Sequence, residues 1–225
     1  MNSTAIPVVT IDGPAGSGKG TIARQVAEIL GYHYLDSGSL YRILALSSQQ
    51  QQVENDDLEA LVELCQTMLI SFEVSSVDEN VRVFLSNQDV SGQLRTEECA
   101  ARASQLAAHP QLRSALLERQ HAFRVLPGLV AEGRDMGTVV FPDSNTKIFL
   151  TASVHERATR RQKQLKKQGI GASLDHLLKE IEARDSRDEN RAISPLRPAK
   201  DAVLVDSTDL SIDQVVQRIV EIVRR

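Results

Sequence analysis

The chain has 225 residues, of which 41% are hydrophobic and 25% are charged, and its formal net charge at pH 7 is −4. This length and composition predict one α/β domain of ordinary size, with a packed core and small insertions. The negative net charge argues against a general nucleic-acid or membrane binder. If an acidic protein of this kind binds phosphate groups, its arginines must be gathered in one cleft.

The start of the chain and the cysteines predict a cytoplasmic protein. Residues Met1–Ile6 lack the basic segment and apolar run of a secretory signal, and no later apolar run approaches the ~20 residues of a membrane span. The 2 cysteines, Cys65 and Cys99, lie far apart in apolar helical patterns, which predicts buried free thiols in a reducing compartment. The sequence has no cysteine–histidine spacing typical of a metal site, so we expect no metal ion held by a dedicated set of side chains.

A glycine-rich stretch follows the first apolar run. Val8–Asp12 predicts a buried parallel strand, and a helix predicted over Lys19–Leu30 ends at Gly31. Between them, the glycines let backbone N–H groups converge on one anion, while the helix N-terminus adds positive charge and Lys19 can reach the outer phosphates of a nucleotide. We therefore predict a P-loop that binds a donor nucleotide through Gly13, Pro14, Ala15, Gly16, Ser17, Gly18, Lys19, Gly20 and Thr21.

One position departs from the strict P-loop pattern. Gly20 stands where the pattern has a hydroxyl residue, and Thr21 follows one residue later. That hydroxyl normally helps to place Mg²⁺, so direct ligation by Thr21 is left open. The order Gly-Lys-Gly-Thr is similar to that of nucleoside monophosphate kinases.

The next segments predict a second ligand loop and then an insertion. Tyr32–Leu35 predicts a short strand, and the loop after it leads into a helix, at the end of a strand where open α/β sheets bind ligands. Asp36 or Ser37 has the alternative role of a helix N-cap. Alternating patterns over Ile70–Val74 and Val81–Leu85 predict an antiparallel hairpin.

Helices and buried strands then alternate to the end of the chain. Helices are predicted over residues 96–107, 110–124, 154–168, 174–191 and from the capping box at residues 211–214 to residue 223, and strands over residues 129–131, 147–150 and 203–206. This alternation predicts a parallel, doubly wound sheet covered by helices.

Charged side chains gather in two of these helices. Arg184, Asp188 and Arg191 fall at i, i+4 and i+7 and share one predicted helix face, while Arg157 and Arg160 lie on a strongly basic helix. Spacing alone leaves open that both sets are solvated faces, and it is the P-loop upstream that favours a role in binding phosphate.

Four segments, in order along essentially the whole chain, resemble the bacterial cytidylate kinase family. They are Gly13–Thr21, Leu35–Arg42, Glu132–Thr138 and Arg184–Arg191, and the Gly-Arg-Asp and Arg-Asp-x-x-Asp-x-x-Arg elements in the last two are more specific than the P-loop. One departure is Ala15, which stands where family members often carry a serine near the acceptor phosphate.

The resemblance implies an enzyme that phosphorylates CMP and dCMP to CDP and dCDP, with ATP as donor and Mg²⁺, by direct in-line transfer. The negative net charge argues against a nucleic-acid or membrane partner, and a monomer is the default expectation because no surface stripe in the sequence demands a partner. The resemblance also implies one domain with a core at residues 1–69, 96–151 and 192–225, a nucleotide-binding insert at about 70–95 and a lid at about 152–191 that closes on the donor.

The resemblance carries roles over to single residues. Those implied to act in the transfer itself are Lys19, Arg134, Arg160 and Arg191, and Arg157 joins the P-loop at the donor. The resemblance implies that the phosphate of the acceptor nucleotide is bound by Arg42, Arg134 and Arg191. It implies that the ribose is bound by Arg184 and Asp188, and the cytosine by Ser104, Arg113 and Asp135. Ser37 and Tyr41 are implied to line the same pocket.

The chemistry of the bases supports this assignment independently. The carboxylate of Asp135 can accept a hydrogen bond from the amino group of cytosine, and the guanidinium of Arg113 can donate to the ring acceptors. Uracil would place an oxygen opposite the carboxylate, and an unpaired buried polar group discriminates strongly. We therefore predict CMP and dCMP in preference to UMP.

Two other functions remain open at this stage. Asp89-x-x-Gly92 matches a fragment of a GTPase switch, although it follows a hairpin and the chain has no Asn-Lys-x-Asp guanine motif. A P-loop kinase of another small acceptor would need a base near a hydroxyl group, a role open to Asp36. The arginine-rich acceptor side favours an acceptor that carries a phosphate, which is already an anionic nucleophile and needs no base.

Overall fold

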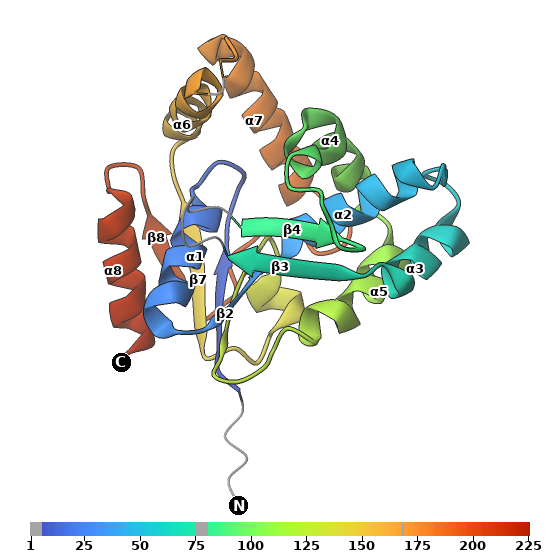
Figure 1. Cartoon of the computed structure of the whole chain (residues 1–225). Coiled ribbons are helices and arrows are strands. Elements are labelled where there is room, and N and C mark those ends of the chain that lie inside the picture. The colour runs from blue at the N-terminus through green and yellow to red at the C-terminus, as the bar shows by residue number, and fades with distance from the viewer. Residues whose placement is uncertain (1–5, 75–80, 168) are drawn as a thin grey trace, which may run out of the picture. The chain divides into compact units, whose positions relative to one another are not determined.

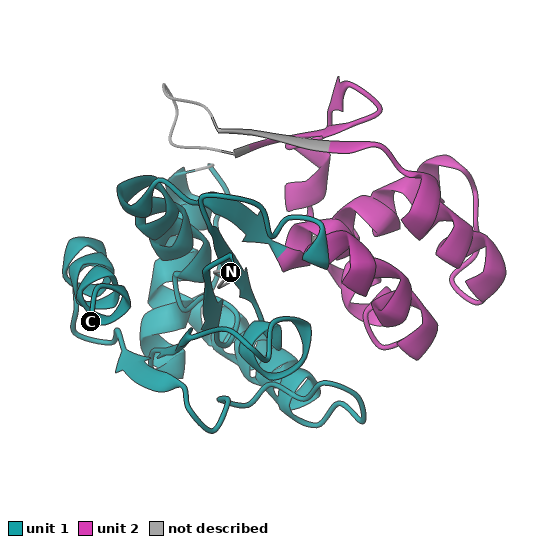
Figure 2. Cartoon of the chain, turned by 90° about the horizontal axis from the view of Figure 1, so that it is seen from below, with its two compact units in different colours: residues 1–36, 121–225 teal, residues 37–120 magenta. Residues whose placement is uncertain are grey.

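The computed structural model describes residues 6–74, 81–167 and 169–225 (Figure 1). The chain forms two compact units, one of Met1–Asp36 with His121–Arg225 and the other of Ser37–Gln120 (Figure 2). The predicted division into core, insert and lid stays a prediction.

The first unit is built on a five-stranded parallel sheet, as predicted. Its strand order is β2-β6-β1-β7-β8, with β1 at Val8–Asp12, β2 at His33–Asp36, β6 at Leu129–Gly133, β7 at Thr146–Thr151 and β8 at Val203–Asp206. Every neighbouring pair is parallel, and all residues of β1 and β6 are buried. The carboxyl ends of β1 and β6 meet, because Asp12 pairs with Gly133 in the register.

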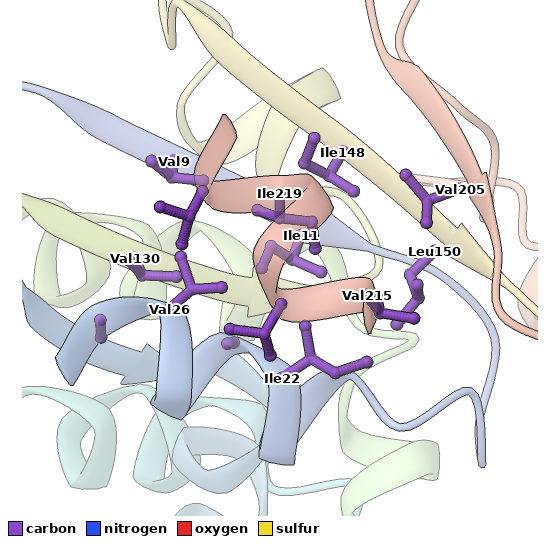
Figure 3. Close-up of a cluster of buried hydrophobic side chains, with 14 residues drawn as sticks. Val9, Ile11, Ile22, Val26, Val130, Ile148, Leu150, Val205, Val215 and Ile219 are labelled. Atoms are coloured by element: carbon purple, nitrogen blue, oxygen red, sulfur yellow. The ribbon is translucent and has the colours of Figure 1, made fainter. Parts of the chain in front are cut away.

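Helices α1 (Lys19–Leu30) and α8 (Ile212–Val223) pack on the sheet through one apolar cluster (Figure 3). Ile22 and Val26 of α1 and Ile219 of α8 meet buried side chains of β1, β6, β7 and β8. The predicted end of α1 and the predicted start of α8 are confirmed. Gly31 closes α1 with a φ of 66°, and α8 begins with the Ser211–Gln214 capping box.

Two more helices of this unit, α6 (Val154–Lys167) and α7 (Leu174–Glu189), pack on each other through Ala158, Leu177 and Ile181. The helix predicted over residues 174–191 is shorter in the structure, because α7 ends at Glu189 and Arg191 lies beyond it. Asn190 occupies the C-cap, and its side-chain amide donates to the Ser186 carbonyl at 2.8 Å, which competes with continued helix.

The second unit contains helices and a small antiparallel sheet. Its helices are α2 (Ser37–Gln50), α3 (Leu58–Thr67), η1 (Gln93–Arg95), α4 (Glu97–Leu106) and α5, which spans Pro110–His121 and ends three residues earlier than the predicted 124. The predicted antiparallel pairing is confirmed as β3 (Ile70–Val74) against β4 (Val81–Leu85), with Phe72 opposite Val83, while the predicted turn at residues 75–80 lies outside the described residues. A further two-residue strand β5 (Gln88–Asp89) was missed, because so short a strand has no periodicity.

Burial agrees with the predictions from hydrophobic pattern. Cys65 and Cys99 are buried free thiols, as expected. Among the described residues, no helix is both long and apolar enough to cross a membrane.

Candidate functional site

The predicted P-loop joins the end of the central strand β1 to the start of α1. Gly13 has a φ of 154°, and a Cβ atom there would lie 2.0 Å from the Leu150 carbonyl oxygen, so only glycine fits between β1 and β7. Gly18 precedes α1 in the left-handed region with a φ of 91°. The loop can therefore turn its N–H groups toward one side, in front of the helix N-terminus.

Lys19 is buried at the first position of α1. Its Nζ donates to the carbonyl oxygen of Pro14, inside the same loop, at 2.8 Å. Burial lowers the pKa of Lys19, and the nearby guanidinium of Arg134 lowers it further. An anion placed beside Lys19 would therefore stabilise its charged form.

Glu132 is a buried carboxylate close to Lys19 that sequence reasoning did not assign. It lies near the end of β6, and its Oε1 accepts a hydrogen bond from the Tyr34 hydroxyl at 3.1 Å. Burial raises the pKa of Glu132, and the charge of Asp36 raises it further. A Cβ atom at Gly20 would lie 3.0 Å from Glu132 Oε1, so the glycine in place of the usual hydroxyl residue leaves room for this carboxylate. The sequence did offer a signal for this residue, because Glu132 is the charged residue that directly follows the apolar run at residues 129–131.

Asp12, at the end of β1, was also missed. Its Oδ1 and Oδ2 accept the backbone N–H groups of Met136 and Gly137, each at 2.8 Å. Burial raises its pKa to about 6, against the lowering effect of these two hydrogen bonds. These bonds hold the first turn of the short π-helical segment η2 (Met136–Val140), directly after the buried residue Asp135.

Two predicted acceptor-side arginines, Arg134 from a distant segment and Arg191 from three residues along the chain, meet at the carboxylate of Asp188. Asp188 is 1% exposed, and its Oδ2 accepts from Arg134 Nε at 2.8 Å while its Oδ1 pairs with Arg191 Nη2. Burial alone would raise the pKa of Asp188, but the guanidiniums of Arg134 and Arg191 outweigh it and lower that pKa. A solvated helix face, which spacing had left open, does not describe Asp188. Arg184, on the same helix, lies close enough to lower the pKa of Lys19.

The two predicted lid arginines are held by protein groups. Arg157 is 3% exposed and pairs with Asp185, and its Nη1 also donates to the Ala15 carbonyl at 2.9 Å. Arg160 donates to the carbonyl of Ser207 at 2.6 Å and to the carbonyl of Ser17 at 3.3 Å. The solvated alternative therefore does not hold for Arg157 either.

The remaining predicted substrate residues lie in the second unit. Ser37 is buried at the start of α2, and its hydroxyl donates to Gln120 Oε1 at 2.7 Å. The guanidinium of Arg113 on α5 lies 5.7 Å from the ring centroid of Tyr41, and Arg42 Nη1 donates to the Leu94 carbonyl at 2.6 Å. Ser104 is half-buried on α4.

The structure offers oxygen atoms rather than a preformed metal cage. Within the described ranges, no group of three or more His, Cys, Asp or Glu side chains is arranged to hold a metal ion. Mg²⁺ is usually held by one or two carboxylates together with water and substrate phosphates. Glu132 and Asp12, whose charges both act on Lys19, are carboxylates of that kind, so the residues present fit a phosphate-bound Mg²⁺.

Comparison with known proteins gives consistent matches over the whole chain. The family model described as Cytidylate kinase matches residues 9–225. The chain is 52% identical over 219 residues to the cytidylate kinase of Klebsiella pneumoniae, which covers 97% of this chain and 96% of that protein. It is 54% identical over 209 residues to the cytidylate kinase of Aeromonas hydrophila, with 93% and 90% covered, and 53% identical over 223 residues to that of Salmonella paratyphi A, with 99% and 97% covered.

Proposed function

Because this chain belongs to the cytidylate kinase family and is a nucleoside monophosphate kinase, we propose that it transfers the γ-phosphoryl group of ATP to CMP and dCMP. The single observation that supports two phosphate sites is that Lys19 in the P-loop and the Arg134–Asp188–Arg191 cluster occur in one unit. Family membership sets aside the GTPase switch and the kinase of an unphosphorylated acceptor.

The donor side of the proposal rests on the P-loop. Its backbone N–H groups and Lys19 bind the β- and γ-phosphates of ATP, and the lowered pKa of Lys19 rises again beside these charges. Mg²⁺, when bound, neutralises phosphate charge that develops during transfer. Glu132 and Asp12 are the carboxylates that would hold that ion.

The acceptor side of the proposal rests on the arginines. Arg134 and Arg191 bind the phosphate of CMP, and Asp188 keeps both guanidiniums oriented before the nucleotide arrives. Arg42 adds a third guanidinium, and Arg184 with Asp188 binds the ribose. The nucleophile is a phosphate oxygen that is already anionic, so alignment and charge neutralisation suffice and no general base acts.

The base selectivity rests on hydrogen-bond complementarity. Asp135 accepts from the amino group of cytosine, Arg113 donates to its ring acceptors, and Ser104 completes the set. Ser37 and Tyr41 are further residues that we propose to contact CMP. Uracil leaves Asp135 facing an oxygen, so UMP is the poorer acceptor.

A coupled assay of ADP release tests the proposal. With ATP and Mg²⁺, we expect rapid ADP release with CMP and dCMP, slower release with UMP, and little with AMP or shikimate. Lys19→Ala should lose most of the CMP-dependent rate, by a factor of about 10³ or more, because it removes the charge that follows the transferred phosphoryl group.

The controls separate loss of function from loss of folding. The melting temperature of Lys19→Ala shows whether the variant is folded, and we expect that it is, because the hydrogen bond of Lys19 to the Pro14 carbonyl lies within its own loop. Faster turnover of AMP or shikimate than of CMP would refute the substrate assignment. Wild-type turnover in Lys19→Ala would refute the role of the lysine.

A further inference from the structure

Two carbonyl groups of the P-loop accept hydrogen bonds from arginines of helix α6. Arg157 Nη1 donates to the Ala15 carbonyl at 2.9 Å, and Arg160 Nη1 donates to the Ser17 carbonyl at 3.3 Å. The two arginines are three residues apart and so share one face of α6. Alternate carbonyl groups of the loop are thus bound by successive arginines of one helix. Since N–H and C=O groups of a peptide point in opposite directions, holding these carbonyls also fixes where the adjoining N–H groups point.

Arg157 is itself immobilised, which makes it a rigid link. Its Nε donates to the Ala152 carbonyl at 3.1 Å, and its Nη1 and Nη2 bind the two carboxylate oxygens of Asp185 at 3.0 and 2.5 Å. The loop approaches it closely, because a Cβ atom at Gly16 would lie 3.3 Å from Arg157 Cβ. A bidentate pair of this kind fixes the plane of the guanidinium as well as its position. The side chain of Asp185 is 14% exposed, so water screens the pair only weakly.

Asp185 has no part in the donor, phosphate, ribose or base contacts proposed above. It lies on α7, between Arg184 and Asp188, and its carboxylate is directed to Arg157 instead. On the basis of the proposed function, we propose that Asp185 is a positioning residue for donor binding. It acts through Arg157, which holds the P-loop in the shape that receives the phosphates of ATP.

This proposal and a direct role of Arg157 make opposite predictions. If Arg157 must leave Asp185 in order to bind the donor phosphates, then Asp185 competes with ATP, and weakening the ion pair improves ATP binding. If Arg157 is the link that shapes the loop, weakening the pair impairs ATP binding, because small displacements at a phosphate site are costly. Asp185→Asn separates the two cases, since it removes the charge and keeps the size of the side chain.

The experiment compares kinetics and binding for the full-length wild type, Asp185→Asn and the control Glu182→Gln. The control removes one negative charge from an exposed position of the same helix. We expect Asp185→Asn to raise the KM for ATP about tenfold while the KM for CMP stays unchanged, and Glu182→Gln to change neither. Arg157→Lys should act in the same direction, because lysine cannot form the bidentate pair. The double variant should be no worse than the worse single variant, since both disrupt one link.

Calorimetric titration with Mg·ATP alone provides the second readout and does not depend on turnover. An ATP affinity that is unchanged or tighter in Asp185→Asn would overturn the proposal. Equal weakening of ATP and CMP binding would also overturn it, because that result indicates general disruption of α7. If the wild type bound ATP but showed no CMP-dependent turnover, the proposed function would fail, while the titrations would still decide the role of Asp185.

Discussion

Glu132 and Gly20 together account for the unusual form of the P-loop at the scale of single residues. The hydroxyl residue of the strict pattern is replaced by a glycine, and a buried carboxylate from β6 reaches to within 3.0 Å of where its Cβ atom would lie. The Tyr34 hydroxyl holds that carboxylate in place at 3.1 Å. The departure in the motif therefore has a steric partner in a strand more than a hundred residues later in the chain.

The substitution Gly20→Ser tests this pairing. We expect a loss of about 1–3 kcal/mol in the free energy of unfolding, because the new side chain collides with a restrained carboxylate. This loss exceeds the roughly 0.5 kcal/mol that serine gains over glycine in a helix. Urea unfolding measures it, with Gly92→Ser as control, since a Cβ atom at Gly92 meets nothing within 4 Å. Shortening the carboxylate by Glu132→Asp should relieve the loss, and equal unfolding of Gly20→Ser and wild type would show that the space is not limiting.

The ionised carboxylate of Asp188 should make the stability of the protein depend on pH. The pKa of Asp188 lies below its ordinary value of 3.8, because the guanidiniums of Arg134 and Arg191 outweigh the effect of burial. The folded state therefore binds this proton less readily than the unfolded chain, so the stabilisation is present above about pH 4 and is lost as the pH falls through the folded-state pKa. Asp188→Asn should cost about 3 kcal/mol at pH 7, and the difference from wild type should shrink below pH 3.8.

Unfolding free energies of both proteins at pH 7, 5 and 2.5 measure this difference. A gap between wild type and Asp188→Asn that stays constant over this range would contradict the role of the ionised carboxylate. Asp175→Asn, at an exposed position in the first turn of α7, is the matched control.

At the scale of elements, the strands and helices of the first unit could be predicted because their signals are local. Val8–Asp12 is rich in β-branched residues, Gly31 stops α1, and Ser211 with Gln214 forms a capping box within four residues of sequence. The P-loop could be predicted for the same reason, since the whole site is contiguous in the chain.

Other features depend on contacts between distant segments and had no local signal. The first turn of the π-helical segment η2 is bound by Asp12, which accepts the N–H groups of Met136 and Gly137, more than a hundred residues further along. The burial of Arg157 was likewise invisible in a basic helix, since its partner Asp185 comes from α7. The spacing of residues in the sequence predicted that Arg184 and Asp188 share one helix. It could not show that Arg134 donates a hydrogen bond to Asp188.

Asp12→Asn tests the link between β1 and η2. An asparagine can accept only one of the two N–H groups well, because its amide nitrogen is a donor. We expect a loss of about 1–3 kcal/mol in stability. Asp135 precedes η2 directly, so its displacement should also lower the preference for CMP over UMP about tenfold. Urea unfolding and the ratio of kcat/KM values measure the two effects.

The exposed Asp209→Asn should change neither quantity. If Asp12→Asn lost stability with unchanged selectivity, Asp12 would support the fold without positioning Asp135.

At the scale of the whole molecule, a protein of net charge −4 has to bind two strongly anionic nucleotides. The first unit meets this requirement locally: Lys19, Arg134 and Arg184 lie near enough to one another that each arginine lowers the pKa of the lysine. The carboxylates of the half-buried Asp185 and the buried Asp188 hold arginines that such a cluster would otherwise drive apart. Net charge thus gives little guidance to this function, whereas the local arrangement of charges supports it.

The function proposed for this enzyme is transfer of the γ-phosphoryl group of ATP to CMP in preference to UMP. A competition in one tube measures that preference directly, because the ratio of products from equal concentrations of two acceptors gives the ratio of their kcat/KM values. Chromatography of an early time point with ATP, Mg²⁺, CMP and UMP at pH 7.5 should show CDP in excess over UDP by a factor of about 10² or more. Equal amounts of CDP and UDP, or an excess of UDP, would contradict the account.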